Sequence, residues 1–265
     1  MVIDNTRWAS AGRPPTPGET ALTTSDTTAL PDAPLPDLPD APLLALRDIV
    51  VRAEADGRIL LRIPKLDIAA GERVVVTGPS GSGKSMLLSC LCGRWAAGLR
   101  AEGERTASGS RIGFVPQRGL DALHPLIPLG RQLRSVTGAS PGRIAEVLCS
   151  VGLDDPELGR RRPAELSGGQ AQRGALALAL LTRAPLILAD EPTSALDHES
   201  RDLMLGLLTR IVNPGQALIV ATHDTVVAEA IATRHIRVVD GRVTETPVGG
   251  ARDTGEPISE HEGAA

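Results

Sequence analysis

Hydrophobic residues between positions 42 and 248 fall into short runs that alternate with amphipathic segments. Short apolar runs bounded by turn residues predict buried strands, and apolar positions three and four apart predict helices. The predicted strands are 72–78, 111–117, 185–190 and 217–222. The predicted helices are 84–95, 168–183, 198–212 and 224–233. Strands that alternate with helices indicate an α/β domain with a parallel sheet covered on both faces.

Three further features extend this pattern. Residues 44–52 and 58–66 predict two strands of an antiparallel β edge subdomain. Residues 236–240 and 241–245 predict a closing pair of strands. Prolines and glycines interrupt residues 119–165, which predicts a helical insertion subdomain made of short helices.

The two ends of the chain differ from this central part in composition. Residues 1–41 are rich in Pro, Thr, Asp and Ala, and residues 249–265 are acidic. Such segments bury too little apolar surface to fold alone. We therefore expect a disordered N-terminal arm, one domain over 42–248, and a disordered acidic tail.

Composition excludes several classes of function. The chain of 265 residues has a net charge of −4, which gives no general attraction to nucleic acid. No apolar run approaches the ~18 residues that span a membrane, so any role at a membrane is expected to act through a partner. The three cysteines form no CxxC pair, which favours reduced thiols in a cytosolic compartment.

GPSGSGKS, residues 78–85, follows one predicted strand and opens a helix. It matches GxxxxGK[ST], in which backbone N–H groups surround phosphates, the lysine reaches the terminal phosphates and the hydroxyl binds Mg²⁺. We expect Lys84 to be an exposed side chain that contacts the β- and γ-phosphates of ATP, and Ser85 to ligate the metal. The alternative is a Gly/Ser turn with a chance lysine, although the chain has only two lysines. The expected phosphate-loop residues are Gly78, Pro79, Ser80, Gly81, Ser82, Gly83, Lys84, Ser85 and Met86.

Two carboxylates end the strand within PLILADEP, residues 185–192. Ligands of α/β sheets bind at this end of the strands. Asp190 is the expected partner of Ser85 at Mg²⁺, and Glu191, facing the other side of the strand, is the expected general base for an attacking water. The alternative is an acidic strand end that caps the following helix.

Two more polar residues end neighbouring strands. His223 follows the strand at 217–222, where its imidazole could hold the γ-phosphate or the water. Gln117 ends the strand at 111–117 and could reach Mg²⁺ or the water. Each is a weak signal alone, since a lone histidine is more often structural.

LSGGQAQR, residues 166–173, predicts a second helix start with exposed N–H groups, and so a second anion site. Ser167 and Gln170 also fit a capping box, a reading compatible with anion binding.

The chain resembles the ATP-binding subunit of an ABC transporter over 42–248, through six motifs in a fixed order: GPSGSGKS, VPQ, LSGGQAQR, LILADEP, SALD and THD. The resemblance implies a P-loop NTPase (RecA-like) fold, ATP and Mg²⁺ as ligands, and catalytic roles for Glu191, His223 and Gln117. It implies that Ser167, Gly168, Gly169 and Gln170 complete the ATP site of a second ATPase subunit, with Asp197 along the dimer seam. It also implies transmembrane permease partners, an extracytoplasmic substrate-binding protein, and a peripheral location on the cytoplasmic face of the membrane.

The segment RGLDALHPLIPLGRQL, residues 118–133, is similar to a pattern of the peptide/nickel importer branch. One departure from the family is the lack of an aromatic residue near Ala53, where the family stacks adenine. The alternatives are an ABC exporter, a soluble ABC ATPase of repair, ribosome or cluster assembly, and a nucleotide-dependent module without turnover, which Glu191 disfavours.

Overall fold

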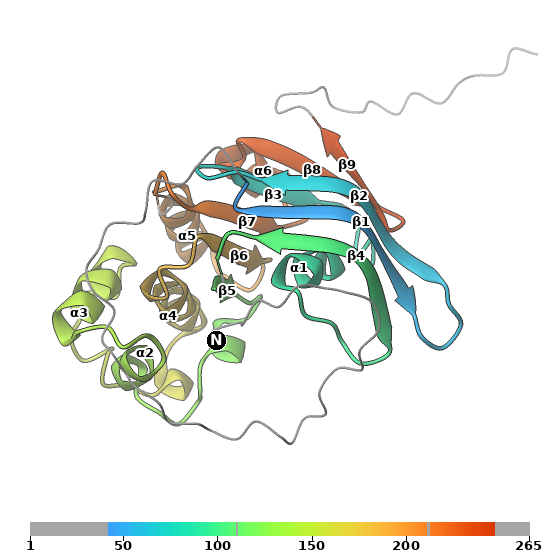
Figure 1. Ribbon diagram of the computed structural model, residues 1–265. Helices are drawn as coiled ribbons and strands as arrows, with labels where there is room; N and C mark the ends of the chain where they lie inside the picture. Colours follow the sequence, from blue (N-terminus) through green and yellow to red (C-terminus); the bar gives the residue numbers. More distant parts are fainter. Residues whose placement is uncertain (1–41, 110, 211–212, 247–265) are drawn as a thin grey trace, which may run out of the picture.

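The computed structural model describes residues 42–109, 111–210 and 213–246, which form a nine-stranded sheet flanked by helices (Figure 1). The strand order is β4-β1-β2-β9-β8-β3-β7-β6-β5. The expected N-terminal arm and acidic tail lie outside the described residues. No helix in the described part is both long and apolar enough to cross a membrane.

The central strands are parallel, as the alternating pattern predicts. They are β3 (Arg73–Thr77), β5 (Ile112–Val115), β6 (Leu186–Asp190), β7 (Ala217–Ala221) and β8 (Arg234–Val239). The interior residues of β3, β6 and β7 are buried, because helices cover both faces of the sheet. The α/β fold class predicted from the sequence is confirmed.

The antiparallel edge has three strands rather than the two that the sequence predicts. β1 (Leu44–Ala53) pairs with β2 (Ile59–Ile68) on one side and with β4 (Leu99–Ala107) on the other. Half-buried and exposed positions alternate along β4, which has no buried residue. Its sequence LRAEGERTA therefore lacks the apolar run on which strand prediction depends, and pairing with β1 decides its conformation.

Helices connect and cover the parallel strands. They are α1 (Lys84–Cys92), α4 (Gly168–Leu181), α5 (His198–Arg210) and α6 (Thr225–Ile231). The hairpin formed by β8 and β9 (Arg242–Thr246) lies within the sheet and joins the parallel strands to β2, rather than closing its edge. α1 ends three residues before the predicted boundary, because Gly93 adopts a left-handed conformation (φ 67°) at its C-cap.

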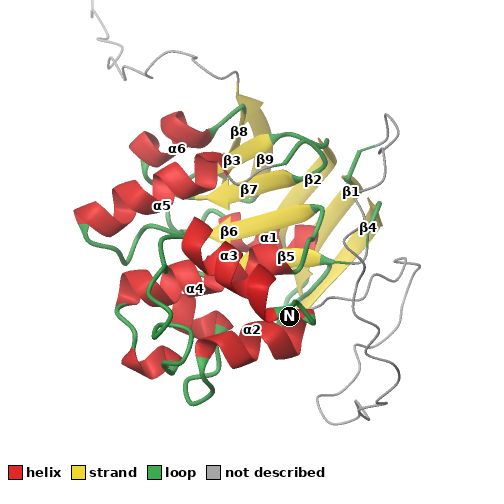
Figure 2. Cartoon of the chain, turned by 90° about the vertical axis from the view of Figure 1, so that its left-hand side faces the viewer, coloured by secondary structure: helices red, strands yellow, loops and turns green. Residues whose placement is uncertain are grey.

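The insertion contains η1 (Gly119–Ala122), α2 (Leu129–Thr137), α3 (Pro141–Ser150) and η2 (Pro163–Glu165). α2 and α3 pack with α4, α5 and α6 on one face of the sheet (Figure 2). α1 and the antiparallel edge form a second apolar core on the opposite face. The two cores place the starts of α1 and α4 on opposite faces of one sheet.

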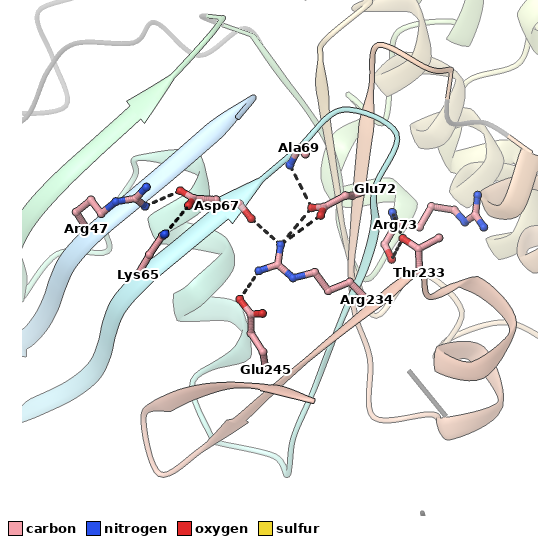
Figure 3. Close-up of polar contacts among 9 residues, drawn as sticks. All are labelled: Arg47, Lys65, Asp67, Ala69, Glu72, Arg73, Thr233, Arg234 and Glu245. Carbon is pink, nitrogen blue, oxygen red and sulfur yellow. Dashed lines mark hydrogen bonds and ion pairs between the residues drawn. The ribbon is translucent and has the colours of Figure 1, made fainter. Parts of the chain in front are cut away.

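A polar cluster fixes the end of β3 that lies away from residues 78–85 (Figure 3). The Arg234 guanidinium donates to the backbone oxygen of Asp67 at 2.6 Å and to the Glu72 carboxylate at 3.3 Å, and it pairs with Glu245. The Thr233 hydroxyl accepts a hydrogen bond from the backbone N–H of Arg73 at 2.8 Å. These contacts join β2, β3, β8 and β9, so the strand that leads into residues 78–85 is held at its start.

Candidate functional site

The phosphate loop, residues 78–85, joins the end of β3 to the start of α1. Three of its glycines have positive φ: Gly78 at 153°, Gly81 at 78° and Gly83 at 110°. A Cβ at Gly78 would lie 2.1 Å from the backbone oxygen of Val238. Only glycine fits there, so the loop folds tightly against β8 and its open side is left to a ligand.

Inside the loop, Lys84 is buried, with 9% of its surface exposed. Its Nζ donates to the backbone oxygens of Gly78 at 2.8 Å and Pro79 at 3.3 Å. The sequence interpretation of Lys84 as an exposed side chain is therefore wrong, because the loop curls around the ammonium group. Ser82 Oγ is buried without a hydrogen-bond partner among the described residues. A buried hydroxyl of this kind favours a polar ligand in the loop.

Ser85 and Asp190 meet at the mouth of the loop. Ser85 Oγ donates to Asp190 Oδ2 at 3.1 Å, although 105 residues separate the two in sequence. Burial raises the pKa of Asp190, and the charge of Glu191 adds to this, while the Ser85 hydrogen bond and Lys84 oppose it. The described residues include no cluster of three or more His, Cys, Asp or Glu side chains that could hold a metal. A hydroxyl and a carboxylate are nevertheless ligands that Mg²⁺ uses together with phosphate oxygens.

Glu191 stands beside this pair in a left-handed conformation (φ 46°). Its backbone N–H donates to the oxygen of Ala221 at 2.8 Å, and its Oε1 lies 2.9 Å from His223 Nδ1. The same Oε1 lies 4.0 Å from Lys84 Nζ. Strand alternation alone does not predict this turn, which directs the carboxylate of Glu191 toward His223 and Lys84.

Gln117 reaches Glu191 through a third residue. Its amide nitrogen donates to Ser194 Oγ at 3.1 Å, and Ser194 Oγ donates to the backbone oxygen of Glu191 at 3.0 Å. Gln117 is thus linked to the backbone of Glu191 only through Ser194, whereas Ser85 and Asp190 bind one another directly. A pocket of about 230 Å³ opens here, lined by residues that include Glu191, Ser194 and His223.

The capping box predicted at 166–173 is present at the start of α4. Ser167 Oγ accepts from the N–H of Gln170 at 3.2 Å, and Gln170 Oε1 accepts from the N–H of Ser167 at 3.0 Å. Ser167 and Gly168 are exposed, and a Cβ at Gly168 would meet nothing within 4 Å. The helix start is therefore open to an approaching molecule.

Asp197 lies next to this helix start. It accepts from the Ser200 N–H at 2.8 Å and from the Ser200 hydroxyl at 3.0 Å, and the backbone hydrogen bond holds its pKa below the usual range. A Cβ at Gly169 would lie 2.7 Å from Ser200 Oγ, so α4 and α5 begin in close contact.

Sequence reasoning missed Gln172. Its side chain is 2% exposed, and its amide nitrogen donates to the backbone oxygen of Pro116 at 2.9 Å. The available signal was a polar residue just before the apolar run of α4.

Comparisons with known proteins agree with this arrangement. A family model described as "ABC transporter" matches residues 61–194. The aliphatic sulfonates import ATP-binding protein SsuB of Cupriavidus necator is 39% identical over 206 residues, covering 75% of this chain and 66% of its own length. The lipoprotein-releasing system ATP-binding protein LolD 2 of Rhodospirillum rubrum is 38% identical, covering 72% of this chain and 89% of its own length.

Longer proteins match as well. The chain is 37% identical to the macrolide export ATP-binding/permease protein MacB 1/2 of Paracoccus denitrificans, with 74% of this chain matched but only 31% of that protein. A solved ATP-binding cassette, a dimer in a post-hydrolysis state bound to ADP and Pi, superposes with a TM-score of 0.65 at 31% identity. That match covers 78% of this chain and all of the cassette.

Proposed function

Since this chain belongs to the ABC transporter family, we propose that it is an ATP-hydrolysing subunit that powers transport through partner membrane permeases. One observation carries the proposal. Ser85 and Asp190 lie 3.1 Å apart at the mouth of a glycine loop that encloses Lys84, beside a Glu191–His223 contact of 2.9 Å. This geometry supports a site that combines a phosphate cradle, a pair of ligands for a hard metal ion and a general base.

Each of these residues has a proposed task. When ATP binds, the Lys84 ammonium replaces its hydrogen bonds to loop carbonyls with hydrogen bonds to phosphate oxygens. The N–H groups of the phosphate loop bind the rest of the triphosphate. Ser85 and Asp190 would hold Mg²⁺, which neutralises charge on the phosphates when it is bound. Glu191 accepts the proton of the attacking water. His223 orients that carboxylate. Gln117 is linked to the backbone of Glu191 through the Ser194 hydroxyl.

The exposed start of α4 is the proposed contribution to a partner. Ser167 and Gly168 are exposed, and the capping box leaves the other N–H groups of the first turn open to an anion. We therefore propose a head-to-tail pair of ATPase subunits, equal or different, at the cytoplasmic face of a membrane. In this pair α4 of each subunit completes the ATP site of the other, and Asp197 lies along the seam.

For the transported molecule, we propose a solute that a permease moves, without naming a specific compound. The similarity of residues 118–133 to the peptide/nickel branch has a structural explanation. Gln132 is buried, donates to the backbone oxygens of His124 and Ile127, and accepts from the N–H of His124. The pattern thus fixes a loop, and the named relatives do not single out that branch. An importer, with a substrate-binding protein, remains the proposal favoured by SsuB. MacB 1/2 represents the exporting alternative, and LolD 2 serves a lipoprotein-releasing system.

Mixing two inactive variants tests the proposed function. Lys84→Ala keeps its α4 start but loses the phosphate contact, and Ser167→Arg keeps the phosphate loop but blocks the helix start. In a mixed dimer, one site combines both lesions and the other is intact. An equal mixture should recover about a quarter of the wild-type ATPase rate, because half of random two-fold dimers are mixed and each has one working site.

The control is each variant alone, which should be nearly inactive at the same total concentration. Dimer formation by the mixture is measured by light scattering with ATP. Mixed dimers without any recovered ATPase rate would contradict the head-to-tail arrangement.

The absence of an aromatic residue near Ala53 gives a second test. Ala53 ends β1, and the neighbouring Arg52 donates to the backbone oxygen of Gly57 at 3.3 Å. We expect the protein to distinguish ATP from GTP poorly, and Ala53→Tyr to tighten ATP binding by ~0.5–1.5 kcal/mol through ring stacking. Competition binding of the two nucleotides measures both effects. A strong native preference for ATP would contradict the expectation.

A further inference from the structure

Gln172 makes a buried polar contact between α4 and the segment that precedes Gln117. The amide nitrogen of Gln172 donates to the backbone oxygen of Pro116 at 2.9 Å, across 56 residues of sequence. Only 2% of the Gln172 surface is exposed. A polar side chain buried in this way costs free energy unless it is hydrogen-bonded, so the contact with Pro116 stabilises the position of both elements.

A second contact fastens the same two elements. A Cβ at Gly119 would lie 2.3 Å from the backbone oxygen of Ala171 and 2.5 Å from the backbone nitrogen of Gln172. The backbones of η1 and α4 therefore touch directly, and only glycine permits this approach. Residues 116–119 are held to α4 on both sides of Gln117.

Gln117 extends this connection to the hydrolytic carboxylate. Its amide donates to Ser194 Oγ at 3.1 Å, and Ser194 Oγ donates to the backbone oxygen of Glu191 at 3.0 Å. A continuous path thus runs from α4 through Pro116, Gln117 and Ser194 to Glu191. The same helix begins at Ser167, the residue that faces the partner in the proposed dimer.

We propose that Gln172 is a positioning residue that fixes Gln117, and through it the backbone of Glu191, to the helix whose start serves the partner's ATP. This inference rests on the proposed function. Gln172 then acts within its own chain, and movement of α4 on closure of the dimer changes the position of Gln117. Through Gln172, the position of α4 at the partner's ATP site is coupled to the position of Gln117 at the chain's own ATP site.

Gln172→Leu removes the donor while keeping an apolar side chain of similar size, and Gln172→Met repeats the test with an unbranched one. Thr182→Val is the matched control. Thr182 is also buried, caps the other end of α4, and donates from Oγ1 to the backbone oxygen of Ala179 at 2.6 Å. The variants at Gln172 lose its hydrogen bond to Pro116, whereas Thr182→Val loses two buried hydrogen bonds, since Thr182 Oγ1 also accepts from the N–H of Ala184 at 3.3 Å. Only the variants at Gln172 affect the path to Glu191.

The Lys84→Ala and Ser167→Arg mixture lets the change be placed in either chain. The intact site takes its phosphate loop, Gln117 and Glu191 from the Ser167→Arg chain, and its helix start from the Lys84→Ala chain. Gln172→Leu in the Ser167→Arg chain should lower kcat about tenfold with little change in KM, within the usual range of coupling between sites. The same substitution in the Lys84→Ala chain should change kcat less than about twofold.

Thr182→Val should give equal and small effects in both chains. The proposal would be overturned if Gln172→Leu and Gln172→Met lowered kcat equally in the two chains, or in neither chain. The unfolding temperature and the ATP affinity of each variant confirm that it is folded. If the mixture shows no ATPase rate before Gln172 is changed, the proposed function has failed rather than this inference.

Discussion

Glu191→Gln is expected to stop steady-state ATP hydrolysis while ATP binding persists. The amide keeps the size of the carboxylate but cannot accept the proton of the attacking water. A general base contributes roughly 10²–10⁴ to the rate, and a loss of that size is expected in kcat. The phosphate loop and the Ser85–Asp190 contact are unchanged, so ATP should accumulate on the protein. The ATPase rate and the bound nucleotide are the two measurements.

The same substitution should trap the dimer, because ATP held between the phosphate loop and the partner's α4 is not consumed. Gel filtration with ATP and Mg²⁺ should shift the variant toward a dimer, and ADP should not. Glu229→Gln is the control, since Glu229 is an exposed carboxylate on α6. Hydrolysis near the wild-type rate in Glu191→Gln would rule out Glu191 as the base.

Lys84→Ala should remove ATP binding and carry a cost in stability. Hydrogen bonds to a charged group contribute about 1.5–3 kcal/mol each, so losing the ammonium's contacts with phosphate should weaken ATP binding by about 100-fold. The backbone oxygens of Gly78 and Pro79 also lose their donor, which should lower the free energy of unfolding by roughly 1–3 kcal/mol. Nucleotide titration and urea unfolding measure the two effects.

Lys65→Ala is the matched control, since Lys65 is the other lysine of the chain. Its side chain is 69% exposed and lies 3.5 Å from Asp67 on β2, in the cluster of Figure 3. Surface pairs of this kind contribute about 0–1 kcal/mol, so stability should change little and ATP affinity should remain. Wild-type ATP affinity in Lys84→Ala would contradict the assignment of the phosphate loop.

Local sequence predicted most of the parallel core, because burial on both faces of a sheet demands continuous apolar residues such as those of β3, β6 and β7. It failed at β4, a strand without a buried residue whose charged sequence carries no comparable signal. The predicted end of α1 at residue 95 is wrong for a local reason: Gly93 adopts a left-handed conformation, which ends the helix at Cys92.

The candidate site divides in the same way. The sequence by itself determined which groups exist: a glycine loop with Lys84 and Ser85, carboxylates at 190 and 191, and a helix start at 167. Each of these groups is defined by a few consecutive residues, so the sequence alone shows which groups are present and how they are spaced. Only the tertiary structure decided that Lys84 is buried, that Gln117 contacts Ser194, and that Gln172 binds Pro116. The contacts of Gln117 and Gln172 join residues 77 and 56 apart in sequence, and Glu191, whose Oε1 lies 4.0 Å from Lys84 Nζ, comes from the end of another strand. No periodicity encodes these contacts, because they depend on how the strands and helices pack into one sheet.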